Sequence, residues 1–312
     1  MKKRFHFYIV GGVLLIGLIL GSFFDLQINA AIFNRDSIFG LGVSAFGMIP
    51  GYGALAFLGG ALFAMTFKDQ RFPKWAKAIF IAVSAALVVV ATIFLGRDVF
   101  AVNGFYKLEN LYWLGFVIMG IFSAAIAVGG YFVAKGNTNP NMWIATLILA
   151  FAIFMALVPG VTLFKAIMHR PRYRIGVYEN LVTFHNWWEP CKDYKEVIAG
   201  FPNVLSKEEF KSFPSGHAGA TMCSMILLSY IPVFNKKYEK YQVLFFYIGF
   251  AWSLVVMFAR MLVGAHYLSD VCVGAILTLV FFYIANEIIV RKILDKEEKA
   301  EEKPEEKAEE AK

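Results

Sequence analysis

The chain has 312 residues, of which 59% are hydrophobic and 17% are charged. Soluble domains average about 45–50% apolar and about 25% charged residues, so this composition excludes an ordinary soluble protein. It indicates an integral membrane protein with one domain. The formal net charge is +7, although residues 295–312 are net acidic. In a protein with many spans such an excess of cations belongs to short cytoplasmic loops, so it does not indicate a nucleic-acid partner.

Apolar segments long enough to cross a bilayer recur along the sequence. They lie at 7–24, 51–67, 75–95, 113–135, 142–164, 216–233, 242–262 and 267–290. The first has no small-residue cleavage site near its end, so we expect an uncleaved span and not a signal peptide. Residues 25–48 mix apolar and polar side chains, which predicts an interfacial helix. The charged tail, 295–312, has no apolar face and is expected to be disordered. The predicted fold is therefore an all-α polytopic membrane helix bundle with about eight transmembrane helices.

The loops between these segments predict the orientation of the chain. The loops at 68–77, 135–141 and 236–240 carry lysine and no more acidic than basic residues, as the positive-inside pattern expects for the cytoplasmic side. Eight crossings then place both termini in the cytoplasm. They also place the long loop at 165–213 and the stretch at 260–270 on the extracytoplasmic side of the cell membrane.

Three polar clusters interrupt the apolar sequence after residue 164. They are Lys165–Arg172, Pro214–His217 and Arg260–Asp270. Ionisable groups at a membrane edge are costly to place and indicate a functional site. His266 and Asp270 stand four residues apart at the start of an apolar run, so a shared helix face would let the carboxylate orient the imidazole. We interpret His266 as a nucleophile toward phosphorus and Asp270 as its orienting partner.

The other cluster residues complete a phosphoryl-transfer site. His217 is the candidate donor of a proton to the leaving group. Ser215 is expected to cap the helix that follows, and Gly216 lets the backbone approach an anion at the helix N-terminus. Three cations are expected to bind the non-bridging phosphoryl oxygens: Lys165, Arg172 and Arg260. No metal or other cofactor is predicted, because the sequence has no carboxylate cluster and its cysteines lack metal-ligand spacing.

The three clusters resemble the three signature motifs of the type 2 phosphatidic acid phosphatase superfamily, which includes lipid phosphate phosphatases, bacterial acid phosphatases and vanadium haloperoxidases. The family pattern reads K-x6-R-P, then P-S-G-H, then S-R-x5-H-x3-D. The first motif runs from Lys165 to Arg172, with Tyr173 where proline is usual, and Arg170 competes with Arg172 for the phosphate contact. The second motif is intact, and the third has Ala259 where serine is usual.

The resemblance, which covers about 165–290, implies a six-helix phosphatase core with two additional helices. It divides the chain into N-terminal helices at 1–140, a core with the three motifs at 141–294 and the tail at 295–312. It implies metal-independent hydrolysis of a lipid phosphomonoester or pyrophosphate, of the polyprenyl pyrophosphate, phosphatidic acid or phosphatidylglycerophosphate type, through a phosphohistidine. The partners would be that lipid and the bilayer, with no nucleic acid.

Alternatives to a phosphatase stay open from the sequence. A lipid-linked phosphotransferase would use the same residues, whereas a transporter would carry ionisable residues near the midpoints of its spans. A haloperoxidase fits poorly because those enzymes are typically soluble. The identity of the lipid and the oligomeric state are not predicted. In the long loop, Trp187 and Trp188 are predicted to shape the mouth through which a lipid headgroup enters.

Overall fold

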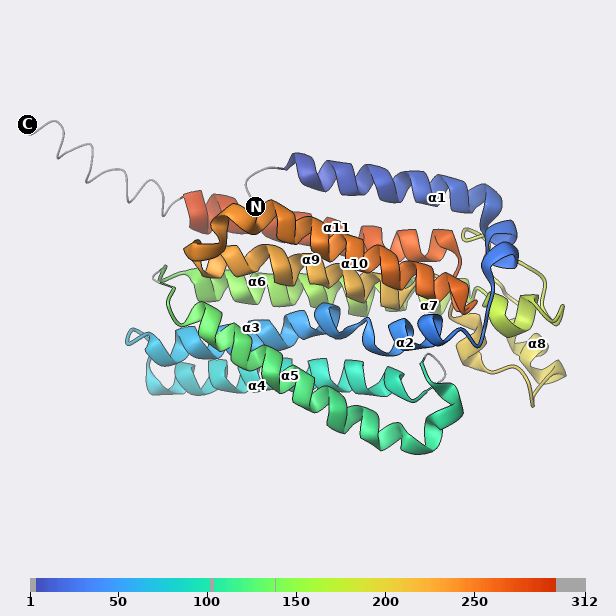
Figure 1. Cartoon of the computed structure of the whole chain (residues 1–312), viewed down its shortest axis with the longest axis horizontal. Helices are drawn as coiled ribbons and strands as arrows, with labels where there is room; N and C mark the ends of the chain where they lie inside the picture. The colour runs from blue at the N-terminus through green and yellow to red at the C-terminus, as the bar shows by residue number, and fades with distance from the viewer. Residues whose placement is uncertain (1–3, 102–103, 138, 296–312) are drawn as a thin grey trace, which may run out of the picture.

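The computed structural model describes residues 4–101, 104–137 and 139–295, and these residues form helices and connecting segments without a β-strand. The long helices run side by side in one elongated bundle (Figure 1). Apart from Asp295, the predicted disordered tail at 295–312 lies outside the described residues.

Within the described residues, eight helical segments are long and apolar enough to cross a membrane. They are Phe5–Ile32, Ile38–Phe67, Lys74–Val99, Tyr106–Ala134, Met142–Met168, Gly216–Phe234, Lys236–Leu262 and Leu268–Leu294. Each corresponds to one apolar segment of the sequence, so the predicted all-α bundle of about eight transmembrane helices is confirmed. The protein is a multi-pass membrane protein.

The helices begin and end where local chemistry requires it. Their bounds are α1 Phe5–Ile32, α2 Ile38–Phe46, α3 Ile49–Lys68, α4 Lys74–Val99, α5 Tyr112–Ala134, α6 Met142–Met155, α7 Val161–Met168, α8 Tyr194–Gly200, α9 Gly216–Phe234, α10 Gln242–Leu262 and α11 Leu268–Ile289. Ser37 caps α2 by accepting a hydrogen bond from the backbone N–H of Gly40. Between α6 and α7 a π-helical turn, Ala156–Gly160, contains Pro159, which has no N–H to donate to the helix ladder.

The region from 25 to 48 differs from the predicted single interfacial helix. Residues 25–32 are the last turns of α1, a short break follows, and α2 then leads directly into α3. Asp25 and Asn29 are buried on α1 because they have polar partners inside the bundle and do not face a headgroup layer. These partners let α1 continue through a polar stretch that the composition alone assigned to the membrane surface.

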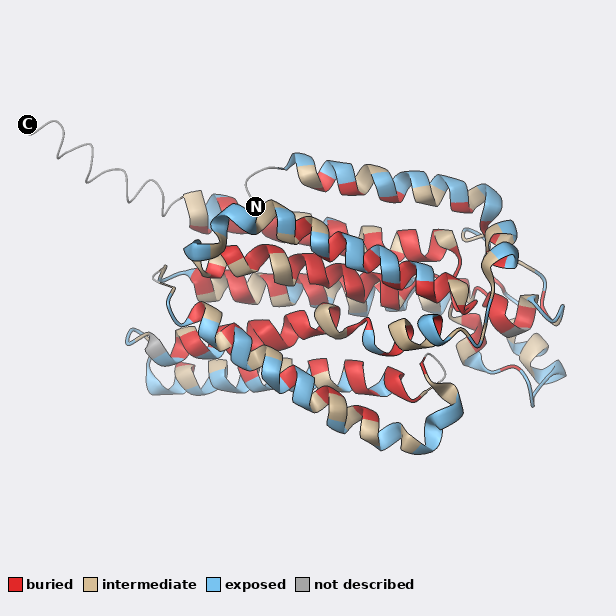
Figure 2. Ribbon diagram, viewed as in Figure 1, coloured by how far each residue is buried: buried red, intermediate tan, exposed pale blue. Residues whose placement is uncertain are grey.

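Helix α9 lies at the centre of the bundle, where most of its residues are buried (Figure 2). It packs against α3, α6, α10 and α11. Small residues allow these close approaches. A Cβ on Gly249 of α10 would lie 2.7 Å from Met225 of α9, and one on Gly274 of α11 would lie 2.2 Å from the carbonyl oxygen of Ser215. The first helix, α1, packs along α11, whereas α4 and α5 pack mainly on α3.

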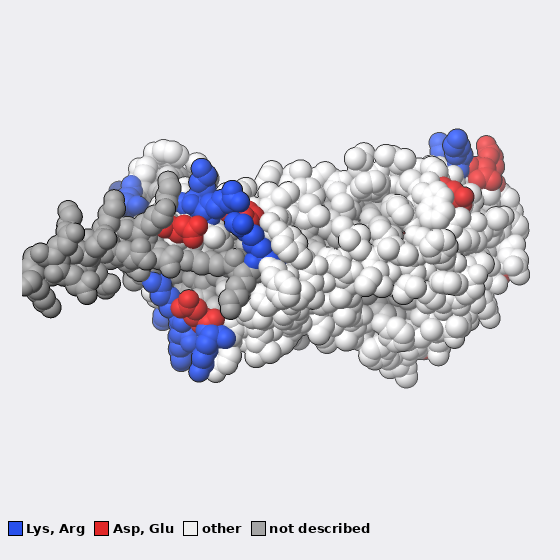
Figure 3. Space-filling model, turned by 90° about the horizontal axis from the view of Figure 1, so that it is seen from above, with Lys and Arg blue, Asp and Glu red and all other residues white. Residues whose placement is uncertain are grey.

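Charged side chains gather at the two ends of the surface shown in Figure 3, with a long uncharged stretch between them. The start of α1 and the end of α11 share one end of the bundle, and the segment with α7 and α8 lies at the other end (Figure 1). The long loop predicted at 165–213 corresponds in the structure to residues 169–215, which join α7 to α9. We keep the name long loop for these residues. The bundle thus brings all three polar clusters to the end that carries this loop.

Candidate active site

The three polar clusters meet where α7, α9, α10 and α11 begin or end. Lys165 lies in α7, His217 in the first turn of α9, Arg260 in the last turn of α10, and Asp270 in the first turn of α11. His266 lies in the short connection between α10 and α11. The ring centroids of His217 and His266 are 6.4 Å apart. Residues separated by more than a hundred positions therefore share one small region.

His266 is held by three hydrogen-bonding contacts, two with backbone carbonyls and one with the side-chain amide of Asn29. Its Nδ1 lies 2.7 Å from the carbonyl oxygen of Ser212. Its own carbonyl accepts a hydrogen bond of 3.1 Å from the amide of Asn29, and its backbone N–H donates to the carbonyl of Arg260 at 3.3 Å. Because a carbonyl oxygen only accepts, Nδ1 must carry the proton, and the lone pair of the neutral ring is on Nε2.

The ring of His266 is kept neutral by its surroundings. Burial, followed by the cations Arg172, Arg260 and Lys165, holds the pKa of His266 well below its usual value. The side chain is 1% exposed. A neutral imidazole with a fixed lone pair on Nε2 is the form that a nitrogen nucleophile requires.

Asp270 does not orient His266 by a direct hydrogen bond, contrary to our prediction. Its Oδ2 lies 4.0 Å from Nδ1 of His266. The carboxylate instead accepts hydrogen bonds from Ser212 Oγ at 2.5 Å, from the backbone N–H of Tyr267 at 2.9 Å and from Arg170 at 2.6 Å. The helix begins only at Leu268, so His266 precedes it and the helical spacing of four residues does not apply. Asp270 therefore acts on His266 through Ser212, whose carbonyl holds the ring.

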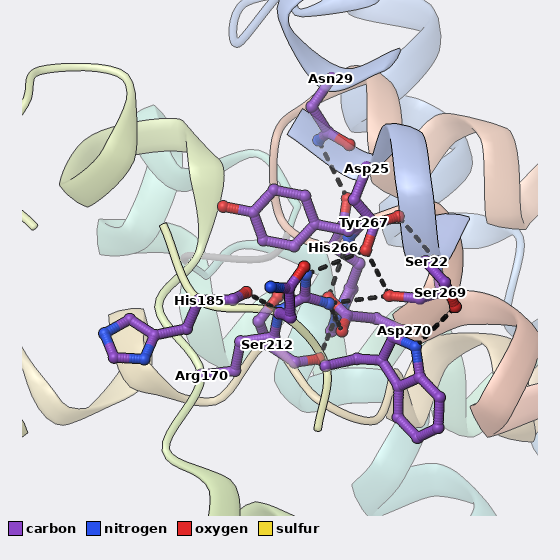
Figure 4. A network of polar contacts seen from close by, with 12 residues as sticks. Ser22, Asp25, Asn29, Arg170, His185, Ser212, His266, Tyr267, Ser269 and Asp270 are labelled. Carbon is purple, nitrogen blue, oxygen red and sulfur yellow. Dashed lines mark hydrogen bonds and ion pairs between the residues drawn. The ribbon is translucent and has the colours of Figure 1, made fainter. Parts of the chain in front are cut away.

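Arg170 is the centre of a buried polar network at the base of the site (Figure 4). Its guanidinium donates to Asp270, to Ser269 Oγ and, at 2.9 Å, to Asp25 Oδ2 of α1. Asp25 also accepts hydrogen bonds from the N–H and the hydroxyl of Ser269. Since two carboxylates already engage Arg170, the choice left open between Arg170 and Arg172 favours Arg172 as the phosphate-binding residue.

The start of α9 is tied to α11. Ser215 caps α9, as expected, because its Oγ accepts from the N–H of Ala218 at 3.2 Å. The N–H of Ser215 donates to the carbonyl of Asp270 at 2.9 Å. A Cβ on Gly216 would meet only Val161, at 3.6 Å, so packing does not demand glycine there and the anion role predicted for Gly216 stays a prediction.

Cations surround the two histidines. Lys165 donates to the carbonyl of Lys211 at 2.9 Å, and Arg260 is fully buried. Arg172 donates its backbone N–H to the carbonyl of Glu209 at 2.7 Å. Burial and then the neighbouring Arg174 lower the pKa of Arg172 to about 10, which still leaves the guanidinium charged at neutral pH. Positive charge gathered at buried sites favours an anionic ligand.

The long loop is fastened beside the site by its own ion pair. Arg174 binds the carboxylate of Glu209 with contacts of 3.1 and 2.7 Å. The N–H of Ser212 donates to the carbonyl of Arg170 at 3.0 Å. These contacts fix Ser212, and with it the carbonyl that holds His266.

The two tryptophans of the loop differ in position. Trp187 donates its indole N–H to Ser22 Oγ of α1 at 2.9 Å and stacks on Phe213, whereas Trp188 is half exposed. The first therefore fastens the loop to α1. The mouth predicted for the pair stays a prediction.

Several site residues were missed in the sequence. Asp25 and Asn29 of α1, Asp98 of α4 and Ser212 of the long loop all contact motif residues. Asp25 and Asp98 are ionisable residues that follow directly on apolar runs, and this position alone marks them as candidates. Ser212 carries no such signal, because its backbone carbonyl and not its side chain contacts His266.

One group of potential metal ligands occurs among the described residues, namely His185, Cys191 and Asp193. It belongs to the long loop, and the ring of His185 points away from Asp270 (Figure 4). The Cys191 thiol donates to Asp193 at 3.4 Å, and burial raises its pKa to about 12. The thiol is therefore protonated and serves as a hydrogen-bond donor.

Comparison with known proteins gives one match. A family model described as PAP2 superfamily matches residues 142–293. No curated protein and no solved structure matches the chain. The matched region runs from α6 to α11 and includes all three polar clusters, while α1 to α5 lie outside it.

Proposed function

This chain belongs to the PAP2 superfamily, and on that premise we propose that it is a metal-independent membrane phosphatase for a lipid phosphomonoester or pyrophosphate. The family supports a phosphatase-type activity on phosphate esters. The observation that carries the proposal is the contact between Nδ1 of His266 and the carbonyl of Ser212, which leaves the lone pair of Nε2 available for attack.

In the first step Nε2 of His266 attacks phosphorus. The bond from phosphorus to the leaving-group oxygen breaks, and His217 gives that oxygen a proton. In the second step water attacks the phosphohistidine and gives a proton to His217. The P–N bond breaks, its electron pair returns to Nε2, and inorganic phosphate leaves. The 6.4 Å between the two ring centroids is a separation that a phosphoryl group can bridge.

The charge that develops on the phosphoryl oxygens is met by Lys165, Arg172 and Arg260. Phosphoryl transfer requires little covalent work from the protein, so fixed cations are its main means of stabilising the transition state. Arg172 and Arg260 can each bind two oxygens in the plane of the guanidinium. The N-terminus of α9 adds N–H groups and the positive end of the helix dipole.

The position of the site supports a lipid substrate. The motif residues lie at the ends of membrane-spanning helices, where a phosphate attached to a lipid would be found. Polyprenyl pyrophosphate, phosphatidic acid and phosphatidylglycerophosphate all present such a group. With the lysine-containing loops at the opposite end of the bundle, the proposed location is the cell membrane, with the site on the extracytoplasmic face and both termini in the cytoplasm.

The test is phosphate release by purified protein from a panel of lipid phosphates in the presence of a metal chelator. Release is expected from wild type and is expected to be lost in His266→Ala. Adding an acceptor alcohol separates hydrolysis from transfer, since a phosphotransferase would give the phosphorylated alcohol in place of inorganic phosphate. Unchanged release by His266→Ala would remove the proposed nucleophile, and release only with added metal would remove the proposed reaction.

A further inference from the structure

The proton donor proposed for this site has an unfavourable set of neighbours. Burial opposes a charge on His217 most strongly, and four cations add to it, namely Arg260 of α10, Arg172 of the long loop, Lys165 of α7 and Arg97 of α4. A protonated imidazole is also a cation, so each of these groups opposes the form in which His217 can donate a proton. Unless a negative charge lies nearby, this arrangement leaves the acid without its proton.

Asp98 supplies that negative charge from the last turn of α4. Its Oδ2 lies 3.8 Å from Nε2 of His217, and both side chains are at least nine-tenths buried. The same oxygen lies 3.5 Å from Nε of Arg97. Among the described residues, Nε2 of His217 has no hydrogen-bond partner. The separation is too long for a hydrogen bond, so in this state Asp98 acts on the imidazole through its charge.

The end of α4 is fixed in place against α9. Leu95 and Val99 pack in one buried cluster with Ala220, which lies one turn after His217. After the helix, the chain turns back so that the N–H of Phe105 donates to the carbonyl of Val99 at 2.9 Å. A Cβ on Gly104 would lie 2.3 Å from the carbonyl of Asp98, so only glycine fits at this turn. The carboxylate is therefore held beside His217 by packing on both sides.

We propose that Asp98 is a positioning residue whose carboxylate favours the protonated form of His217 by offsetting part of the repulsion from the neighbouring cations, so that α4, outside the region matched by the family model, completes the acid half of the site. The inference rests on the proposed function. It gives the N-terminal helices a role in the reaction: α1 supports the nucleophile through Asn29 and Asp25, and α4 supports the acid through Asp98.

The experiment compares two leaving groups in the Asp98→Asn variant, which keeps the shape of the side chain and removes its charge. An alkyl phosphate ester needs a proton on its leaving oxygen, whereas p-nitrophenyl phosphate releases a stable phenolate. The value of kcat/KM reports the steps up to phosphorylation of His266. It is expected to fall about 10- to 100-fold for the alkyl ester, within the range that general acids contribute, and to change little for p-nitrophenyl phosphate. Activity on the alkyl ester is also expected to recover as the pH falls, since acid restores the proton on His217.

A matched control is Ser84→Ala, which removes another buried polar group of α4 about four turns away. It is expected to leave both substrates unaffected. Asp98→Glu keeps the charge and is expected to keep the preference between substrates. The ratio of the two rates does not depend on the folded fraction of a preparation, so partial unfolding of Asp98→Asn does not obscure the result.

The outcomes separate the two proposals. A wild type that releases phosphate from neither substrate overturns the proposed function and the role of Asp98 with it. An active wild type whose Asp98→Asn variant loses both substrates equally, with an unchanged pH profile, overturns the role of Asp98 alone.

Discussion

At the scale of single residues, the site depends on backbone groups that fix side chains. The Ser212 carbonyl sets the tautomer of His266, and the Arg260 carbonyl accepts from the N–H of the same histidine. Asp270 acts on His266 indirectly. It accepts a hydrogen bond from Ser212 Oγ and pairs with Arg170. The imidazole is thus positioned by the long loop, which supplies the Ser212 carbonyl, and by the end of α10, which supplies the Arg260 carbonyl.

Replacing Asp270 by asparagine is expected to destabilise the protein and to lower activity together. The ion pair with Arg170 is fully buried, and breaking such a pair by removing one partner costs about 3–5 kcal/mol. Unfolding in detergent, followed with increasing temperature or denaturant, measures the loss. The matched variant Ser212→Ala removes the hydroxyl that donates to Asp270 but keeps the carbonyl, so it is expected to cost less, about 1.5–3 kcal/mol, as for a hydrogen bond to a charged group. A stable Asp270→Asn variant would contradict the network.

The pH dependence follows from the lowered pKa of His266. The folded protein binds a proton on this ring less readily than the unfolded chain, whose histidine pKa is about 6.5. His266 therefore contributes stability above that pH, and the contribution is lost as the pH falls through the folded pKa. In the profile of kcat/KM, corrected for ionisation of the substrate, the acidic limb due to this residue is expected well below pH 6.5. The prediction would be contradicted if the wild-type profile had an acidic limb at or above pH 6.5 and a variant without His266 lacked that limb. The ring would then be charged at rest.

The three motifs could be found in the sequence because each motif is local and its spacing is fixed, and the structure brings their residues together, while their roles in catalysis stay a prediction. The sequence predicted the contact between His266 and Asp270 wrongly, because His266 stands two residues ahead of α11, before the extended residue Tyr267 at which the helix is capped. A helix boundary that differs by a few residues changes which side chains face one another. Asp25 and Asp98 were missed because their partners lie more than a hundred positions away along the chain.

At the scale of the elements, α1 does more than cross the membrane. Ser22, Asp25 and Asn29 lie along one side of its final turns and contact Trp187, Ser269 and His266, respectively. Figure 4 shows Asp25 and Asn29 directed toward the motif residues. The polar composition after residue 24 suggested a surface helix, whereas the partners that bury this stretch are visible only in three dimensions. α1 therefore serves as a support for the connection between α10 and α11.

Loss of the α1 contact to the nucleophile is tested by Asn29→Ala. The variant removes the hydrogen bond to the His266 carbonyl and leaves every proposed phosphate-binding group intact. We expect kcat to fall by about 5-fold with KM nearly unchanged, since one hydrogen bond contributes about 1 kcal/mol and acts on the orientation of His266. Ser22→Ala is the control. It removes the contacts of the hydroxyl with Trp187 and with the carbonyl of Leu18, neither of which is a motif residue, and it is expected to retain the wild-type kcat. Equal losses in the two variants would indicate general loosening of α1 and not a specific support.

At the scale of the whole molecule, eight spans place the start of α1 and the end of α11 at one end of the bundle and the site at the other. The number of spans was predictable from hydropathy, because each apolar run is long and separated by charged loops. The packing of α4 and α5 on α3 was not, since apolar helices carry little information about which neighbours they choose.

The proposed orientation is tested by labelling single cysteines in intact cells with a reagent that does not cross membranes. Lys195→Cys, in the long loop, is expected to react from outside. Lys74→Cys, at the start of α4, is expected to react only after the membrane is opened. Both positions are exposed, so differences in burial do not explain a difference in labelling. The reverse pattern would place the site on the cytoplasmic face.

The central claim is that Nε2 of His266 accepts the phosphoryl group, and it is tested most directly by trapping the phosphoenzyme. Wild type and His217→Ala are mixed with p-nitrophenyl phosphate, whose leaving group needs no proton from His217, quenched under alkaline conditions and analysed by mass spectrometry of the peptide that contains His266. The account predicts a phosphoryl group on His266, more abundant in His217→Ala because water is no longer activated, and none in His266→Ala. Phosphate release with no phosphohistidine at any time, or a phosphoryl group on another residue, would contradict it.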